Sequence, residues 1–189
     1  EIFSIDELIE SFKLENVQKA AAVFDLKRFN WVSSQQLAKL DENGFFEVIK
    51  PFMENEDVNE DYPNYKKILL AMRTSKTNLK DIAHATRPFF FELDGYDEKG
   101  VKKFLNESLE TLTFALEVLS KLTEWNETEL DMALIKVRDY FNLPIPKVNQ
   151  PMRIALVGST VSPSLGLTLE LFGKEKSLER IQKAINFIS

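Results

Sequence analysis

The chain has 189 residues, of which 44% are hydrophobic and 29% charged, so it can bury a core as one domain or two small ones. We expect no membrane span and no secretion leader, because no apolar run is long enough and none follows a basic start. The absence of cysteine excludes disulfides and thiolate metal sites, and a single histidine argues against a histidine metal site. The composition predicts a cytoplasmic protein, and Glu1 in place of a first methionine is typical of an excised fragment.

The net charge of −6 is unevenly distributed along the chain. Eight acidic residues lie between Asp41 and Asp61, where Lys50 is the only basic residue. From Pro151 onward, five basic residues outnumber three acidic ones. Phosphate contacts come mostly from lysine and arginine, so the C-terminal bias is compatible with RNA binding without demonstrating it.

The N-terminal segment predicts helices. Ser4 and Glu7 have the spacing of a capping box, and four apolar residues follow at helical spacing: Ile5, Leu8, Ile9 and Phe12. Asn16 is a candidate cap for an alanine-rich helix that ends at Phe24. A helix over 35–40 is predicted next, capped by Ser33 or Ser34.

Three further helices are predicted before the middle of the chain, over 45–51, 65–73 and 79–85. The first should end at Pro51 and the third near Pro88, because proline disfavours a continuing helix. The acidic segment 54–61 is predicted to be a solvated connector. Residues 89–91, three phenylalanines, are compatible with a strand but are better interpreted as a core-filling linker.

The second half of the chain also predicts helices. A domain boundary near 93–95 divides the chain into units 1–93 and 94–189. The longest helix should run from Asp97 through Leu119, the next is capped by Asn126 and Glu129, and 142–146 is a proline-bounded loop. The last helix carries an apolar stripe of Leu178, Ile181, Ile185 and Ile188. The predicted fold class is all-α.

Residues 151–173 combine several helix signals. Pro151 suits a first helical turn, Ser162 with Pro163 suits a cap and first position, and Gly173 suits a helix end. Such junctions expose backbone N–H groups that can receive a phosphate or a base edge. An alternative is that 153–159 forms the first strand of a nucleotide-binding α/β fold, but the further glycines and the lysine of those motifs are missing.

Arg153 is the first candidate for a functional residue. It lies in a helix that otherwise looks buried, so its planar, five-donor guanidinium should reach an edge of the surface, where it suits a base edge or a phosphate. The alternative is a structural ion pair with a nearby carboxylate.

Motifs at both ends of the chain resemble one family. Pro151-x-Arg153-x-Ala155-Leu156-x-Gly158, then Ser162-Pro163-x-Leu165 and Leu171-Phe172-Gly173-Lys174-Glu175, resemble the C-terminal end of bacterial glutamate–tRNA ligases, which are class I synthetases. Phe3-Ser4-x-x-Glu7-Leu8-Ile9-x-x-Phe12 and Ala22-x-Phe24-Asp25-x-x-Arg28-Phe29-x-Trp31 resemble the region of that family that contacts the tRNA stem. The match spans the chain, strong at the ends and weak in the middle.

The resemblance implies an all-α helical cage in two subdomains that binds the anticodon of glutamate tRNA. The parent enzyme would attach glutamate using ATP, with ATP and magnesium held by a catalytic half outside this chain. The fragment itself should hold no cofactor and be inactive alone. The resemblance further implies a monomer whose partner is the tRNA.

The resemblance also implies roles for particular residues. Arg153 and Ser162 would face the anticodon, Leu165 would make an apolar contact with a base, and Trp31 with Arg28 would contact the stem. Ser164 stands where the family usually has glycine, and its Cβ would limit how closely the backbone approaches RNA.

Residues 72–79 match the second anticodon element of the family. Members that reject glutamine tRNA carry an arginine at the position of Ser75, where the long fork favours the cytosine of the glutamate anticodon over the guanine of the glutamine anticodon. Serine cannot discriminate in that way, although Arg73 or Lys76 could supply a positive contact. The hypothesis is relaxed discrimination, with both tRNAs accepted.

Other interpretations remain open at this point. Residues 74–77 resemble the second signature loop of class I synthetases, but its partner motif is absent and the match is interpreted as accidental. His84 lacks companion residues and is interpreted as a satisfied histidine rather than a base. The rival functions are the anticodon cage of a class I lysyl synthetase and a stand-alone helical protein-interaction domain.

Overall fold

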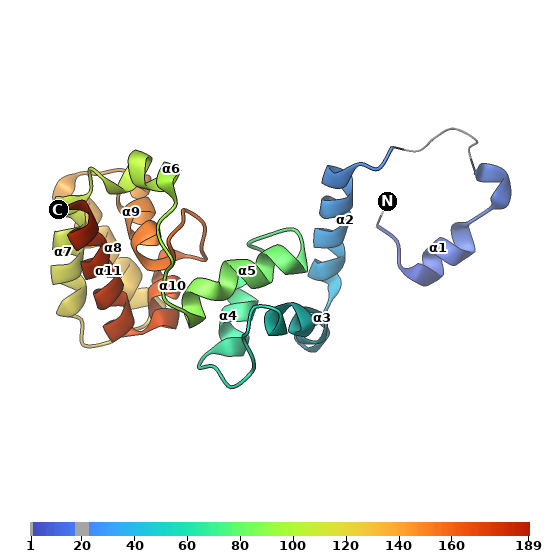
Figure 1. The fold of residues 1–189 in the computed structure, drawn as a ribbon, viewed down its shortest axis with the longest axis horizontal. Coiled ribbons are helices and arrows are strands. Elements are labelled where there is room, and N and C mark those ends of the chain that lie inside the picture. Colours follow the sequence, from blue (N-terminus) through green and yellow to red (C-terminus); the bar gives the residue numbers. More distant parts are fainter. Residues whose placement is uncertain (1, 18–22) are drawn as a thin grey trace.

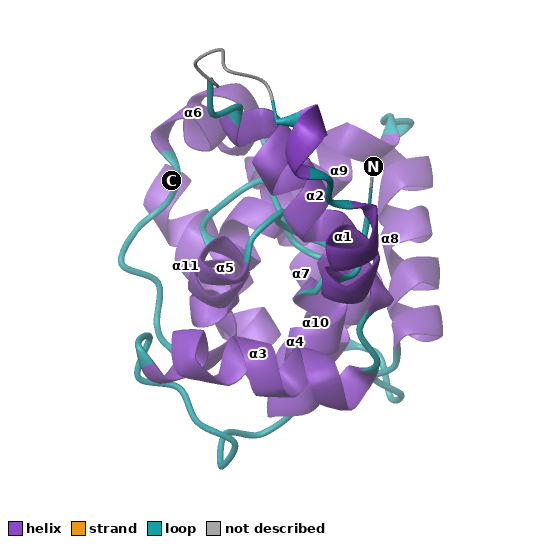
Figure 2. Ribbon diagram, turned by 90° about the vertical axis from the view of Figure 1, so that its right-hand side faces the viewer, coloured by secondary structure: helices purple, strands orange, loops and turns teal. Residues whose placement is uncertain are grey.

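The computed structural model describes residues 2–17 and 23–189, and all regular structure in these ranges is helical (Figures 1 and 2). The elements are α1 (Ile5–Ser11), the 3₁₀ turn η1 (Leu14–Asn16), α2 (Leu26–Lys39), α3 (Glu42–Glu54), α4 (Tyr65–Met72), α5 (Leu79–Phe90), α6 (Glu98–Gly100), the π-helical segment η2 (Val101–Leu105), α7 (Leu109–Ser120), α8 (Glu127–Phe141), α9 (Ile145–Val157), α10 (Leu165–Phe172) and α11 (Lys174–Ile188). The all-α prediction is confirmed. The alternative strand over 153–159 is wrong, because these residues form the end of α9 and the turn after it.

The helices form an elongated molecule (Figure 1). Helices α1 and α2 lie toward one end, α3–α5 lie in the middle, and α6–α11 form a compact bundle at the other end. Residues 91–97 connect the middle group to the bundle, and the predicted boundary at 93–95 lies within this connection. No helix in the described ranges is long and apolar enough to cross a membrane.

Several predicted helix ends are confirmed by their caps. Ser4 and Glu7 form a reciprocal capping box at α1, and the Asn126 side chain accepts from the backbone N–H of Glu129 at 3.1 Å. Gly173 ends α10 with φ of 76°, a left-handed conformation that glycine adopts without a Cβ penalty.

Helix α2 differs from the prediction, which started a helix near Ser33. It begins at Leu26, because Asp25 accepts from the backbone N–H groups of Lys27 and Arg28 at 2.9 and 3.1 Å. Asn16 closes a single 3₁₀ turn, and most of the predicted alanine-rich helix, residues 18–22, lies outside the described residues.

Prolines do not end the helices where the sequence suggested. Pro51 lies inside α3 and Pro88 inside α5, so both helices run further than predicted. The residues four positions earlier, Glu47 and His84, are exposed, so water can solvate the carbonyl groups that each proline leaves unpaired. Phe89 is consequently a buried helical residue, neither strand nor linker.

Helix boundaries in the second half also differ. The predicted helix over 97–119 begins after Asp97 as expected but is interrupted at 106–108, where the hydroxyl of Ser108 donates to the carbonyl of Leu105 at 2.6 Å. Helix α9 begins at Ile145, inside the predicted loop, so Pro151 lies in its interior. Helix α10 is capped by Ser164 and not by Ser162.

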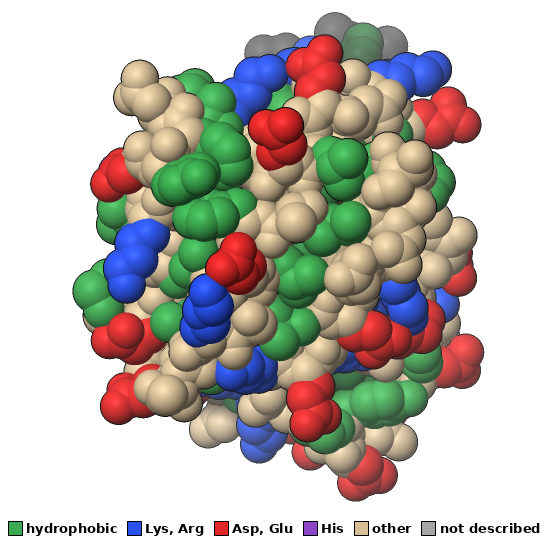
Figure 3. Space-filling model, turned by 90° about the vertical axis from the view of Figure 1, so that its left-hand side faces the viewer, with side chains coloured by type: hydrophobic (Ala, Val, Ile, Leu, Met, Phe, Trp, Pro, Cys, Tyr) green, Lys and Arg blue, Asp and Glu red, His purple; other side chains and the backbone are tan. Residues whose placement is uncertain are grey.

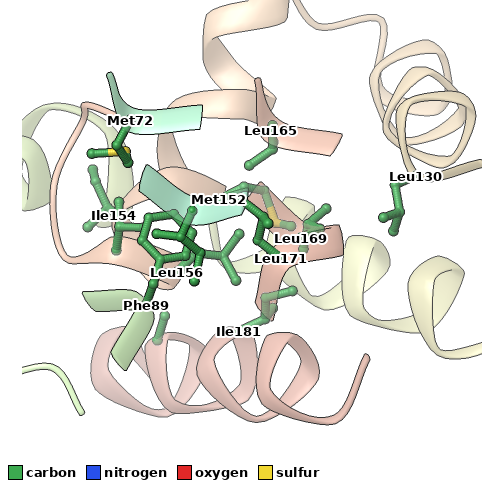
Figure 4. Packing of buried hydrophobic residues seen from close by; sticks show 14 of the residues in the cluster. Met72, Phe89, Leu130, Met152, Ile154, Leu156, Leu165, Leu169, Leu171 and Ile181 are labelled. Carbon is green, nitrogen blue, oxygen red and sulfur yellow. The ribbon is translucent and has the colours of Figure 1, made fainter. Parts of the chain in front are cut away.

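The core is continuous between the middle group and the bundle. Figure 4 shows Met72 of α4 and Phe89 of α5 in one cluster with Ile154, Leu156 and Leu171 of α9 and α10. The Phe89 ring stacks on Phe172 with centroids 4.7 Å apart. The two groups therefore share apolar burial, which favours one relative arrangement.

A buried arginine crosses the same seam. Arg180 of α11 is 1% exposed, and its guanidinium donates to the carbonyl groups of Leu156 at 2.5 Å and Phe91 at 2.6 Å. It also lies 4.6 Å from the Phe172 ring centroid, a cation–π contact. Burial lowers the pKa of Arg180 from its ordinary value. This one side chain joins the end of α5, the end of α9 and α11.

We predict that Arg180→Met lowers the free energy of unfolding by about 2–4 kcal/mol, because the buried carbonyl of Leu156 and the partly buried carbonyl of Phe91 lose their donor. Urea unfolding followed by circular dichroism measures the change. Arg138→Met is the matched control, since Arg138 pairs with its sequence neighbour Asp139 and its loss should change stability by less than about 0.5 kcal/mol. Equal midpoints for the two variants would contradict the role of Arg180.

Candidate nucleic-acid interface

Arg153 holds the loop between α9 and α10. Its NH1 donates to the carbonyl of Ser162 at 2.8 Å, to the hydroxyl of Ser162 at 2.9 Å and to the carbonyl of Pro163 at 2.8 Å. The structure shows no ion pair for Arg153 within residues 2–17 and 23–189, so the alternative of a structural ion pair is not supported. All three bonds use one nitrogen, and over the same ranges Nε and NH2 of this half-buried side chain have no hydrogen-bond partner.

Two hydroxyl groups of this loop, those of Ser162 and Ser164, are already engaged. Ser162 Oγ accepts from Arg153 and from Thr168 Oγ1 at 3.1 Å, and it donates to the carbonyl of Pro163. Ser164 Oγ accepts from the backbone N–H of Leu167 and caps α10. Both serines therefore shape the loop, and a ligand would meet a surface whose backbone is fixed in advance.

Leu165 does not present a surface to a base. It is 2% exposed, and its side chain lies in the core beside Met152 and Leu169 (Figure 4). The role that the resemblance implied for Leu165 has no support in this geometry. Leu165 packs the first turn of α10 against the rest of the bundle.

The N-terminus of α10 is not an open anion site, contrary to the expectation from the sequence. Asp131 of α8 accepts a backbone hydrogen bond from Gly166, and Glu127 accepts from the hydroxyl of Ser164 at 2.5 Å. Burial, followed by the charge of Glu127, raises the pKa of Asp131 above its ordinary value. With two carboxylates beside this helix start, a phosphate would be repelled.

The second predicted element, around residues 73–76, faces a cleft beside α2. Arg73 donates through NH2 to the carbonyl groups of Leu37 and Leu40, and its guanidinium lies 5.0 Å from the Phe45 ring centroid. Arg73 therefore fastens the end of α2 and is not a free cation. Lys76 is exposed, so it is the positive group of this element that a phosphate can reach.

Ser75 is placed unusually. It lines the cleft beside α2, which has a volume of about 330 Å³, together with Ser34, Gln35 and Lys76. Its hydroxyl oxygen is buried and has no hydrogen-bond partner in the described part of the chain. Ser75 therefore brings no charged group to the lining of this cleft.

A second cleft brings the two predicted elements together. It has a volume of about 360 Å³ and lies between Lys76, helix α5 and the loop after α9, where Ser159 and Val161 line it. Lys76 lines both clefts, so the two clefts are neighbours at this residue, and the second one lies between the 73–76 element and the 159–164 loop. Sequence reasoning missed Gln35 and Val161 because no motif marks them.

The two predicted stem-contact residues lie on the exposed part of α2. Trp31 is 45% exposed, and Arg28, also exposed, precedes it by three residues, which puts both on one helix face. By contrast, the outer face of the bundle shows acidic and basic side chains interspersed with apolar ones and no large single-charge patch among its described residues (Figure 3). Phosphate contacts are expected nearer the clefts than on that face.

We predict that Arg153→Ala speeds amide hydrogen exchange at residues 161–164 by about tenfold, because the loop loses all three bonds to NH1. Exchange followed by mass spectrometry measures this. Arg153→Lys is the control that keeps the charge, and since an ammonium lacks the planar fork we expect partial acceleration. Unchanged exchange in both variants would show that Arg153 does not hold the loop.

Comparison with known proteins agrees with this geometry. A helical chain with two clefts bordered by engaged loops is suited to holding single-stranded bases. A family model described as "Anticodon binding domain" matches residues 44–185, so the chain belongs to this family of anticodon-binding domains. The rival reading as a protein-interaction domain is not favoured.

The relatives are glutamate–tRNA ligases. The chain is 33% identical to glutamate–tRNA ligase 1 of Caldanaerobacter subterraneus subsp. tengcongensis and 32% identical to glutamate–tRNA ligase 2 of Thermoanaerobacter pseudethanolicus, over 100% of its own length. It spans 40% of the length of each of these relatives. The structure of a glutamate tRNA ligase from Elizabethkingia meningosepticum in complex with its amino acid superposes with a TM-score of 0.81 and 28% identity, covering 100% of this chain and 38% of that one.

Proposed function

We propose that this chain binds the anticodon of glutamate tRNA as the C-terminal part of a glutamate–tRNA ligase. The observation that carries the proposal is the region bordered by Lys76 on one side and the Arg153-held loop on the other, within an anticodon-binding domain. Single-stranded loops offer splayed bases whose edges can enter clefts of this size. The similarity to glutamate–tRNA ligases supports the choice of tRNA.

The proposed mechanism is binding without chemistry in this chain. Lys76 would contact a phosphate between the clefts, and Nε and NH2 of Arg153, which have no hydrogen-bond partner among the described residues, would donate to a base edge. Trp31 and Arg28 would contact the stem. The parent ligase would attach glutamate using ATP, and ATP with magnesium would bind in a part of the protein outside this chain. We further propose that the ligase works in the cytoplasm as a monomer with one tRNA.

We predict that labelled anticodon stem-loops of glutamate tRNA bind this chain with an affinity that falls steeply as salt rises. Lys76→Ala should weaken binding by about threefold to tenfold and reduce the salt slope by about 1, because one phosphate contact is lost. The control is Lys121→Ala, which removes a lysine paired with Glu117 on α7, away from the clefts. Anisotropy titration at two salt concentrations measures both effects. No binding by the parent at low salt would count against the proposed function.

We also propose that discrimination against glutamine tRNA is relaxed, since Ser75 cannot place a guanidinium in the cleft beside α2. The parent should bind glutamate and glutamine stem-loops with similar affinity. Ser75→Arg should favour the glutamate loop by about tenfold, within the discrimination that a bidentate base contact provides. Ser75→Ala is the control and should leave both affinities unchanged, because the serine hydroxyl has no partner in the described chain. A parent that already strongly prefers the glutamate loop would overturn this inference.

A further inference from the structure

Glu170 of α10 joins three helices with one carboxylate. Its Oε1 pairs with Lys67 Nζ of α4 at 2.5 Å, and its Oε2 accepts from the backbone N–H of Glu127, the first residue of α8, at 2.7 Å. The hydrogen bond from Lys67 is the largest cause that lowers the pKa of Glu170, against the opposing effect of burial. A carboxylate at this position also interacts favourably with the start of α8. Glu170 therefore stays charged and links the middle group to the bundle.

The connection continues to the loop after α9. The carboxylate of Glu127 accepts from Ser164 Oγ at 2.5 Å, and Ser164 caps α10 directly after the carbonyl groups that Arg153 holds. Ser164, at the end of this loop, is thus bonded to the side chain of Glu127. The backbone N–H of Glu127 in turn donates to Glu170.

On its other side, Glu170 is linked through Lys67 to the 73–76 element. Lys67 lies in α4, and α4 ends at Met72, directly before the segment that carries Ser75 and Lys76. The Lys67–Glu170 pair therefore links α4, which leads to the 73–76 element, to α10 and α8, which hold the end of the 159–164 loop.

This ion pair is not needed to keep the two groups together. The side chain of Lys67 is 55% exposed and that of Glu170 is 23% exposed, and pairs of this exposure contribute little to stability. The buried Arg180 bonds and the Phe89–Phe172 stack already join the groups. Loss of the pair should therefore leave the molecule folded, so that any change in the loops can be measured on a folded protein.

We propose that Glu170 is a positioning residue that, paired with Lys67, sets the separation of the 73–76 element and the 159–164 loop. Its effect on tRNA binding rests on the proposed function, whereas its effect on loop separation does not. Neither residue lines the cleft beside α2 or the cleft between these loops, so neither is placed to touch RNA held there.

The first test is a double-mutant cycle on stem-loop binding. Lys67→Met and Glu170→Gln should each weaken binding by about threefold to fivefold, and the double variant should be no weaker than either single one. Lys50→Met is the matched control, since Lys50 is 51% exposed, pairs with Glu60 and lies elsewhere in the middle group. It shows how much a lost surface charge alone weakens RNA binding. Urea midpoints close to that of the parent would show that all variants are folded.

The second test needs no RNA. The chain has no cysteine, so Thr77→Cys and Thr160→Cys provide unique sites for spin labels on the two loops. The distance distribution between the labels should broaden or shift in Lys67→Met and Glu170→Gln but not in Lys50→Met.

The outcomes separate the two proposals. A changed distance distribution with no RNA binding by the parent would reject the proposed function and retain the positioning role. RNA binding by the parent with additive losses, or an unchanged distance distribution, would overturn the positioning role and retain the function.

Discussion

The arrangement of this molecule depends on the buried guanidinium of Arg180. It donates to the carbonyl of Phe91 at the C-terminal end of α5 and to the carbonyl of Leu156 at the C-terminal end of α9. Buried carbonyl groups at helix ends need donors, and a planar fork can serve two of them at once. Arg180 therefore holds the end of α9, where the loop begins, close to the end of α5, which lines the second cleft. The candidate site is a consequence of how the middle group and the bundle are joined.

Local hydrogen bonds explain which helices could be predicted from the sequence. The Ser4–Glu7 box, the Asn126 cap and the Gly173 end each depend on groups within four residues, so their pattern is visible in the chain. The continuation of α5 past Pro88 could not be predicted in this way. It follows from the burial of Phe89 against Phe172, a contact between residues far apart in sequence that outweighs a lost backbone bond.

The site was only partly predictable for the same reason. The motif suggested that Arg153 and Ser162 both face the ligand. In the structure Arg153 donates to the backbone carbonyl and the hydroxyl of Ser162. The motif also suggested Leu165, which the packing of α10 buries. Gln35 carries no sequence signal, because it reaches the cleft only when α2 lies beside the 73–77 segment. The net charge was an equally poor guide. The chain is acidic overall, yet the exposed Lys76 lies where the two clefts meet.

The central claim is that the region between the 73–76 element and the 159–164 loop receives anticodon bases, and cross-linking tests it most directly. A glutamate-tRNA stem-loop with a photoreactive uridine in its anticodon would be irradiated with the chain, and the modified peptides would be mapped by mass spectrometry. The account predicts cross-links within residues 73–77 and 159–164, reduced by unlabelled stem-loop. Cross-links confined to the outer face of the bundle, on α7 or α11, would contradict it.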